Sequence, residues 1–432
     1  MTERRYFIET FGCQMNVNDS EKVAGLLEAE GFAAAASADD ADFVFVNTCA
    51  VREKAAEKLY SSLGRLRRAG ARERRIGVGG CVAQLQGREV LARAPGIDLL
   101  VGTHNISRVP ELLRRADGTG PVVDLDRRAD AFDVPPALVA HRNPVRAYVT
   151  AIEGCNHVCS FCVVPRTRGP EVCRGVDEIA AEIEQLVERG FPEVMLLGQT
   201  VNAYRHGEHD FVALLERVDR IHGLRRLRFT TSHPSHVDRR LARAFARLPR
   251  LCPYLHLPVQ SGSDPILASM RRGYTAGGYG EAIAMLREEC PGLALTSDVI
   301  VGYPGETEAD FEATLDLVAR SRFDGLFAFK YSPRPGTAAL RLRDDVGEEE
   351  KTRRLRVLNE LQQRWQAELN GRRIGRVEEV LFESAPESHR LSGRTRDFRI
   401  VHSDGGEQAV GTLCRVEITG AGPNSLRGRI LH

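Results

Sequence analysis

The sequence is poor in tryptophan, lysine and long apolar runs. Its 432 residues include one tryptophan and 6% aromatic residues, and lysine occurs at so few positions that arginine carries nearly all of the positive charge. No stretch approaches the roughly 18 uninterrupted apolar residues of a transmembrane helix, so a membrane span is not expected. The formal net charge of +1 excludes a global field that would attract nucleic acid, and any basic surface must therefore be local.

The first residues also lack a targeting signal. Met1 to Tyr6 contain no apolar core of the kind found in secretory signal peptides, which predicts a cytoplasmic protein. Ten cysteines in a reducing compartment indicate metal or redox use rather than disulfides. The chain is long enough for two to four domains on the usual size range.

Three of the cysteines stand close together in a C-x3-C-x2-C spacing. Cys155, Cys159 and Cys162 follow a strand-like run at 147–152, and Gly154 breaks this strand so that a loop can form. An iron–sulfur cluster normally takes four thiolates, so three on one loop would leave one iron open to an outside ligand. Structural zinc is the alternative, although the second Cys/His pair that such a site usually requires does not follow.

Strand-like and helix-like segments alternate over the first 120 residues, which predicts a parallel sheet. Cys13, Cys49 and Cys81 each follow the end of a predicted strand. Ligand sites of such sheets lie at the carboxyl ends of strands that are about 4.8 Å apart. The three cysteines could therefore converge on a second cluster, although each alone could equally be a buried structural thiol.

The remaining sequence predicts two further units. A segment rich in Gly, Pro, Asp and Arg at 117–145 indicates a linker, and six strand–helix units after it predict an open, partial barrel. Beyond a helix expected at 348–369, five short strand-like runs separated by glycines predict a small antiparallel β-barrel. Arginines only slightly outnumber acids there, so RNA binding and a mere packing role both remain open.

These motifs together resemble the radical S-adenosylmethionine (SAM) methylthiotransferases. The resemblance covers nearly the whole chain and is carried by the cysteine loop and by Phe11-Gly12-Cys13-Gln14-Met15-Asn16, Asn47-Thr48-Cys49 and Gly79-Gly80-Cys81-Val82. It implies an α/β fold class with four parts: an N-terminal parallel-sheet domain at 1–120, a linker at 121–143, a partial (βα)6 radical SAM barrel at 144–371 and an RNA-binding TRAM-like antiparallel barrel at 372–432.

The resemblance also implies two [4Fe-4S] clusters and SAM as cofactors. One cluster, which binds SAM at its open iron, is expected on the loop thiolates, Cys155, Cys159 and Cys162. An auxiliary cluster, which carries sulfur, is expected on Cys13, Cys49 and Cys81. Gln199, Gln260 and Asp298 follow predicted barrel strands, where they can hydrogen-bond SAM, and Phe161 can lie against its adenine ring. A turn cap is the alternative role for Asp298.

Val163-Val164-Pro165-Arg166-Thr167-Arg168-Gly169, after the cysteine loop, is most similar to the tRNA branch of this family. That branch replaces the C2 hydrogen of N6-isopentenyladenosine, beside the anticodon, with a methylthio group. The alternatives are threonylcarbamoyl-adenosine, a ribosomal-protein aspartate, or a non-catalytic iron–sulfur RNA-binding regulator. The implied partners are tRNA bearing N6-isopentenyladenosine and a flavodoxin-like or ferredoxin-like electron donor. A monomer is expected, and the sequence does not identify the sulfur donor.

Overall fold

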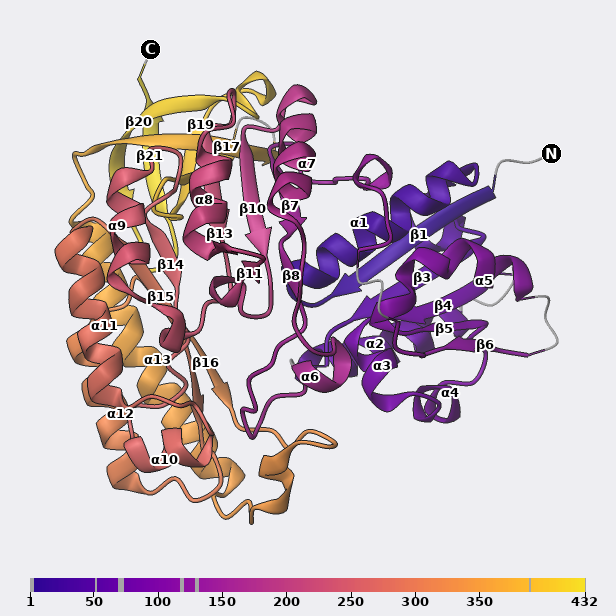
Figure 1. Cartoon of the computed structure of the whole chain (residues 1–432), viewed down its shortest axis with the longest axis horizontal. Helices are drawn as coiled ribbons and strands as arrows, with labels where there is room; N and C mark the ends of the chain where they lie inside the picture. The colour runs from indigo at the N-terminus through magenta and orange to yellow at the C-terminus, as the bar shows by residue number, and fades with distance from the viewer. Residues whose placement is uncertain are drawn as a thin grey trace.

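The computed structural model describes residues 4–50, 53–68, 74–116, 120–128, 132–387 and 390–431. An N-terminal α/β unit lies beside a larger unit of parallel strands and helices, and a small barrel sits at one end of the larger unit (Figure 1). Within the described residues we find no helix with the length and apolar character needed to cross a membrane.

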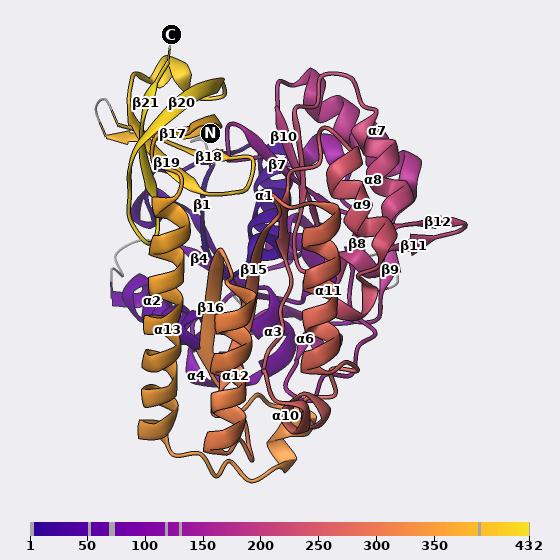
Figure 2. The ribbon, with the colours of Figure 1, turned by 90° about the vertical axis from the view of Figure 1, so that its left-hand side faces the viewer.

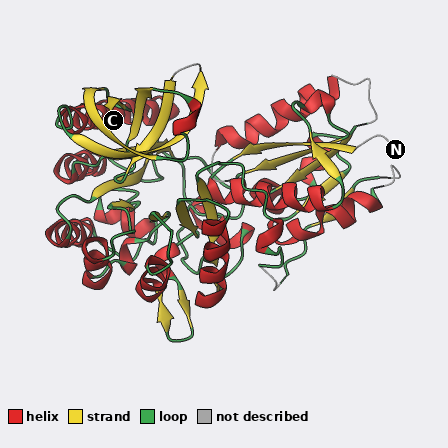
Figure 3. Cartoon of the chain, turned by 90° about the horizontal axis from the view of Figure 1, so that it is seen from above, coloured by secondary structure: helices red, strands yellow, loops and turns green. Residues whose placement is uncertain are grey.

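The N-terminal unit is a six-stranded parallel sheet in the order β2-β1-β3-β4-β5-β6, with helices on both of its faces (Figure 3). Its elements are β1 (Arg4–Phe11), α1 (Gln14–Ala29), β2 (Phe32–Ala34), η1 (Ala38–Asp40), β3 (Phe43–Thr48), α2 (Glu53–Arg68), β4 (Arg75–Gly79), α3 (Cys81–Gln86), α4 (Glu89–Arg93), β5 (Leu99–Val101), η2 (Thr103–Arg108), α5 (Val109–Arg115) and β6 (Val122–Asp124). The central strand β3 is buried along its whole length, as expected for a strand covered on both faces.

The N-terminal sheet has two strands that the sequence does not predict. β2 and β6 are three residues each, too short to produce a periodic pattern. β6 pairs with β5 and lies inside the stretch expected to be linker, so the sheet continues further along the chain than its sequence indicates. The helix predicted to begin at residue 51 has its first two positions outside the described residues.

The larger unit is the predicted partial barrel of six parallel strands. Strands β13-β10-β7 and β14-β15-β16 form two sheets, and a parallel bridge from Leu227 to Leu251 joins them. The elements before and through the first sheet are η3 (Pro136–Leu138), β7 (Arg146–Thr150), β8 (Ile152–Glu153), α6 (Val164–Thr167), β9 (Val172–Cys173), α7 (Val176–Glu188), β10 (Glu193–Leu197), η4 (Val201–Ala203), β11 (Arg205–His206), β12 (His209–Asp210), α8 (Phe211–Asp219), β13 (Arg226–Phe229), η5 (Pro234–His236) and α9 (Arg239–Arg247).

The second half of the barrel places its helices side by side on the outside, as α11, α12 and α13 show (Figure 2). Its elements are β14 (Tyr254–His256), α10 (Asp264–Ser269), α11 (Ala276–Glu289), β15 (Ala294–Val301), α12 (Glu308–Ser321), β16 (Gly325–Lys330), η6 (Ala338–Arg341) and α13 (Glu348–Gly371). One apolar cluster fills the space between strands and helices. In α7, for example, Ile179, Ile183 and Leu186 are buried, because a spacing of three and four residues puts them on one helix face.

The C-terminal residues form the predicted small barrel, which is closed in the order β17-β18-β19-β21-β20. It is not wholly antiparallel as predicted, because β19 and β21 pair in parallel. Its elements are β17 (Val377–Glu387), β18 (Arg390–Thr395), β19 (Ile400–Asp404), η7 (Glu407–Ala409), β20 (Leu413–Ala421) and β21 (Leu426–Ile430). The strand predicted to begin at residue 389 has that first position outside the described residues. Alternating residues such as Val380, Phe382 and Val416 fill its interior.

The turn after β18 is fixed to the amino-terminal end of the large barrel by two fully buried arginines. Arg226 donates to the carbonyl oxygen of Arg394 at 2.8 Å. Arg228 donates to the carbonyl oxygens of Thr395 and Arg396 at 2.8 and 2.7 Å. Buried charges of this kind require partners, so the small barrel is held firmly rather than tethered.

Glu193, at the start of β10, balances the charge of these arginines. It accepts from Arg228 Nε at 2.9 Å and from Arg146. Burial alone would raise the pKa of the Glu193 carboxyl, but the charges of Arg228 and Arg146 outweigh that effect and lower it to about 2. This end of the barrel is therefore a structural polar core, and the opposite, carboxyl end is left for chemistry.

Candidate functional site

The cysteine loop begins where β8 ends at a glycine that no other residue can replace without strain. Gly154 has a φ of 82°, which favours glycine, and a Cβ there would lie 1.9 Å from the carbonyl oxygen of Pro170. The next residue, Cys155, donates its backbone N–H to Gly169 O at 3.1 Å. The loop therefore closes onto the segment that follows it.

The structure brings the three loop thiols together at the carboxyl end of the barrel, as predicted. Cys155 Sγ lies 3.3 Å from Thr200 Oγ1, and Cys162 Sγ accepts from Val164 N at 3.4 Å. Burial raises the pKa of the Cys162 thiol to about 12, and the neighbouring Cys159 and Cys155 add to the increase. Thiols clustered at one buried site in this way are suited to a cation that stabilises their thiolates.

A cleft of about 450 Å³ opens onto all three of these cysteines. Its other walls are Pro165, Arg166 and Pro170, from the segment after the loop, and the turn at 336–338. The cleft lining therefore offers three thiols and no fourth among the described residues. This donor set fits a [4Fe-4S] cluster with one iron left free for an outside ligand.

The zinc alternative would require a histidine beside the thiols. His157, inside the loop, stacks on His233 with ring centroids 3.9 Å apart, and its Nε2 lies 3.1 Å from His236 Nε2. Its imidazole is thus engaged with the segment after β13 rather than with sulfur. His157 lines the cleft, but its ring contacts His233 and His236 rather than sulfur, so the three thiols match the iron–sulfur interpretation better than the zinc one.

The four residues expected to contact SAM are not among those that line the cysteine cleft. Gln199 accepts from Gly154 N with its Oε1, which supports the cysteine loop, while its buried Nε2 has no partner among the residues that the structure describes. Gln260 donates its backbone N–H to Asp298 O at 2.8 Å and has a φ of 75°. The Asp298 carboxylate lies 3.5 Å from His256 Nε2. Phe161 is partly buried and packs against an apolar cluster that includes Ile266 and Tyr303.

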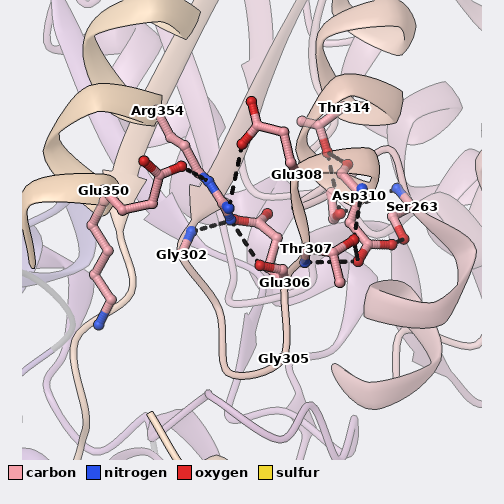
Figure 4. A network of polar contacts seen from close by, with 12 residues as sticks. Ser263, Gly302, Gly305, Glu306, Thr307, Glu308, Asp310, Thr314, Glu350 and Arg354 are labelled. Atoms are coloured by element: carbon pink, nitrogen blue, oxygen red, sulfur yellow. Dashed lines mark hydrogen bonds and ion pairs between the residues drawn. The ribbon is translucent and has the colours of Figure 1, made fainter. Parts of the chain in front are cut away.

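A network of polar contacts fixes the loop after β15 (Figure 4). Arg354 of α13 donates to Glu306 Oε2 at 2.8 Å and to its carbonyl oxygen at 2.9 Å, and Glu306 accepts from Gly302 N. Asp310, at the start of α12, accepts from Thr307 N at 2.9 Å. Because Ser263 also donates to Asp310, the loop after β14, which carries Gln260, is held to the loop after β15, the strand that contains Asp298.

The second cysteine triplet lies at the carboxyl edge of the N-terminal sheet, where the sequence predicts it. Cys13 caps α1, Cys49 donates its N–H to Phe11 O at 2.8 Å, and Cys81 begins α3. A hydrogen bond from Cys49 lowers the pKa of the Cys13 thiol to about 6. Burial raises the pKa of Cys81, on which the charges of Arg168 and Cys13 also act. The structure therefore brings these three thiols together as well.

Arg168 lies between the two triplets, and the sequence motifs give no sign of this position. It follows the cysteine loop in the chain and is buried with only 2% of its side chain exposed. Its guanidinium donates to Asp19 of α1 at 3.4 Å and to Glu153, just before the loop, at 2.9 Å. Because it also acts on Cys81, one side chain joins the surroundings of both triplets.

A second arginine lies near the cysteines at a position that the sequence does not predict. Arg272 donates from Nη1 to Cys159 Sγ at 3.2 Å, although the two residues are 113 positions apart in the sequence. Only the fold brings them together, and neither hydrophobic periodicity nor cysteine spacing contains a signal for such a contact.

Comparison with known proteins gives matches to both large units and to the whole chain. Residues 5–102 match the family described as "Uncharacterized protein family UPF0004", and residues 149–318 match the radical SAM superfamily. A protein of Geobacter sulfurreducens named tRNA-2-methylthio-N(6)-dimethylallyladenosine synthase is 44% identical, over 100% of this chain and 98% of its own. One of the same name from Cereibacter sphaeroides is 47% identical over 99% of each chain.

Solved structures show a related fold at low sequence identity. The radical SAM methyltransferase TsrM of Kitasatospora setae, solved with tryptophan and a SAM analogue, has a TM-score of 0.57 and 15% identity, and the match covers 89% of this chain and 79% of that one. The cobalamin-dependent SAM radical enzyme OxsB has a TM-score of 0.53 with 12% identity, over 83% and 55% of the respective chains. These likenesses concern the fold alone.

Proposed function

The chain belongs to the family of tRNA-2-methylthio-N6-dimethylallyladenosine synthases, and on this premise we propose which of its residues carry the reaction. It is a radical SAM methylthiotransferase, which uses SAM and [4Fe-4S] clusters. The substrate we propose is tRNA with an N6-dimethylallyl (isopentenyl) adenosine beside the anticodon. The product carries a methylthio group in place of the hydrogen at C2 of that adenine.

The observation that carries the proposal is the placement of two thiol triplets on either side of Arg168. Cys155, Cys159 and Cys162 face one cleft, and we assign them to the SAM-binding cluster. When bound, that cluster supplies the electron for reductive cleavage of SAM, and an auxiliary cluster supplies sulfur. We assign the auxiliary cluster to the second triplet, Cys13, Cys49 and Cys81.

The residues expected to contact SAM have positioning roles in this proposal. Gln199 holds the loop through its contact with Gly154 N and leaves its Nε2 free to donate to a ligand. Asp298, in β15, and Gln260, on the loop after β14, offer acceptors and donors to the amino acid or ribose part of SAM. Phe161 is partly buried against an apolar cluster and is proposed to lie against the adenine ring.

Proteins that act on RNA need a basic surface, and here it is local. Arg394, Arg396 and Arg399 of the small barrel are used in internal contacts, whereas Arg415 and Arg427 are exposed. We propose that the exposed arginines meet tRNA phosphates. An external flavodoxin-like or ferredoxin-like electron donor, a monomeric state and a cytoplasmic location, where tRNA is available, complete the proposal.

The test uses the full chain reconstituted with iron and sulfide under anaerobic conditions. With SAM, dithionite and an anticodon stem-loop bearing N6-isopentenyladenosine, we expect 5′-deoxyadenosine and the 2-methylthio nucleoside. Cys162→Ala should yield neither product, and Cys81→Ala should yield 5′-deoxyadenosine without methylthiolation. Cys290→Ala, which removes a buried thiol outside both triplets, is the matched control and should retain both products.

Two results would overturn the proposal. Methylthiolation of a threonylcarbamoyl-adenosine stem-loop but not of the isopentenylated one would change the substrate. Absence of 5′-deoxyadenosine in the reconstituted wild type, at full iron content, would leave only a binding role. In cells, loss of the 2-methylthio-isopentenyl nucleoside from tRNA of a deletion strain supports the assignment.

A further inference from the structure

Arg272 stands out because it is a buried cation beside one cluster thiol. It lies in the turn after α10, where its backbone N–H donates to Leu267 O at 3.0 Å. The residue is only 7% exposed, and its Nη1 donates to Cys159 Sγ at 3.2 Å. A guanidinium at this position is thus within direct contact of the sulfur that we assign to the SAM-binding cluster.

The guanidinium is held rigidly by neutral groups. Nε donates to Tyr274 OH at 2.9 Å and Nη2 donates to Pro258 O at 3.1 Å. Tyr274 OH in turn donates to Val259 O at 2.8 Å. Arg272 is therefore locked between the cysteine loop and the segment after β14, and its charge cannot swing away into solvent.

No carboxylate pairs with Arg272 among the residues that the structure describes, and Cys159 is the anion-forming group that it touches apart from the phenol of Tyr274. A buried cation without a counter-charge is costly. The cost is offset once Cys159 is a thiolate bound to iron, because the cluster with its thiolates is anionic. Arg272 thus has the properties of a group placed for the cluster.

Among the described residues, the other two thiols of the loop have hydrogen-bond contacts with neutral groups. Cys155 Sγ meets the Thr200 hydroxyl at 3.3 Å, and Cys162 Sγ meets the backbone N–H of Val164 at 3.4 Å. The positive charge is therefore directed to one corner of the cluster.

We propose that Arg272 is a positioning residue that raises the reduction potential of the cluster on Cys155, Cys159 and Cys162, acting through Cys159. One-electron reduction makes the cluster more negative, so a fixed cation and an N–H···S contact stabilise the reduced state. The inference rests on the proposed function, since it requires a SAM-binding cluster on this loop. If the inference is correct, the external electron donor can reduce this cluster at a less negative potential.

The experiment is a redox titration followed by electron paramagnetic resonance on the anaerobic, reconstituted full chain. The signal that changes when SAM is added identifies the cluster on this loop, and iron content is measured for each protein. The variants are Arg272→Met, which removes charge and donors, Arg272→Gln, which removes charge only, and Arg272→Lys, which retains charge. Arg166→Met is the matched control, because Arg166 lines the cysteine cleft but is exposed and donates to Gly336 O rather than to sulfur.

Arg272→Met should shift the ratio of reduced to oxidised cluster about tenfold towards the oxidised form at a given potential, which is about 59 mV for one electron. Arg272→Gln should shift it less, and Arg272→Lys and Arg166→Met least. The slower formation of 5′-deoxyadenosine by Arg272→Met with dithionite should recover with the stronger reductant titanium(III) citrate, which a merely structural defect would not do.

An unchanged midpoint in Arg272→Met and Arg272→Gln at full iron content would overturn the inference. So would a change in SAM affinity alone, which would make Arg272 a SAM ligand. If the neutral variants fail to hold iron, the Arg272→Lys variant decides. A midpoint potential close to that of the wild type supports the charge effect. A midpoint potential too low for dithionite to reduce the cluster refutes it. Failure of the proposed function is distinguishable, because it appears in the wild type as the absence of any SAM-responsive signal.

Discussion

Arg168 and Asp19 form a buried ion pair, with Nη1 and Oδ1 3.4 Å apart and a second, closer contact between Nη2 and Oδ2. Arg168 comes from the segment after the cysteine loop, and Asp19 from α1 of the N-terminal sheet. Each side chain is less than 5% exposed. The pair therefore joins the two units close to the cysteines of both.

Replacing Arg168 with methionine should destabilise the protein by about 3–5 kcal/mol, because Asp19 and Glu153 would be left as buried, unpaired carboxylates. Urea unfolding of the anaerobic protein measures the change. Arg217→Met is the control, since Arg217 pairs with Glu184 on the surface, and its loss should cost less than about 1 kcal/mol. An equal decrease in the free energy of unfolding of the two variants would show that the buried pair between the units stabilises the protein no more than a surface pair does.

Gly154→Ala should prevent the cysteine loop from closing, because the added Cβ would lie 1.9 Å from Pro170 O at a φ of 82°. Iron analysis of the reconstituted protein should fall from roughly eight to roughly four atoms per chain. Gly190→Ala has a similar φ of 94° with no atom within 4 Å. It carries the backbone strain without the clash and should keep its iron; if it loses as much, strain rather than the contact is responsible.

The Glu193 carboxyl should make the wild type sensitive to acid. Its folded pKa of about 2 is below the usual value of about 4.3, so its ionised form contributes stability above pH 4.3 that is lost as the pH falls towards 2. The difference corresponds to about 3 kcal/mol. In urea unfolding, Glu193→Gln should be much less stable than the wild type at pH 7, and the gap should narrow on acidification.

The control for this pH dependence is Glu184→Gln, which removes a surface carboxylate. Its stability should follow that of the wild type at every pH. A constant gap between Glu193→Gln and the wild type from pH 7 to pH 3 would contradict the assigned ionisation.

The exposed arginines of the small barrel should contribute to RNA affinity but not to chemistry. Arg415→Gln and Arg427→Gln should each reduce the dependence of log affinity on log salt by about one, as expected for loss of one phosphate contact. Filter binding of the tRNA at several salt concentrations measures this slope. Arg429→Gln removes the same charge from a side chain already paired with Glu417 at 2.6 Å and should change the slope less; an equal change would indicate a diffuse effect of net charge.

Features that are local in the sequence could be predicted, and those created by folding could not. Cys13, Cys49 and Cys81 were found because cysteines at successive strand ends of a parallel sheet share one edge. The strands of both barrels were found from their alternation and their glycines. β2 and β6 escaped because three residues carry no period.

The long-range polar contacts had no signal in the sequence. Arg272 reaches Cys159 across 113 positions, and the partners of Arg226 and Arg228 lie in another unit of the chain. Gln199 is predicted to contact SAM from the end of a barrel strand, and its contact with Gly154 N has no signal in the sequence. The small barrel's arginines were counted as a possible RNA surface, whereas Arg399 binds Asp324 and Arg373 binds Asp397.

The hydrogen bonds from Arg226 and Arg228 to the small barrel fix its position relative to the cysteine cleft at the other end of the large barrel. If, as proposed, the substrate base enters the cysteine cleft and tRNA phosphates meet the small barrel, the distance between these two parts of the RNA must match the distance between the two sites. The choice of tRNA would then depend on this distance as well as on the modified base. An isopentenylated adenosine at the wrong distance from the phosphates that the small barrel binds would not be methylthiolated.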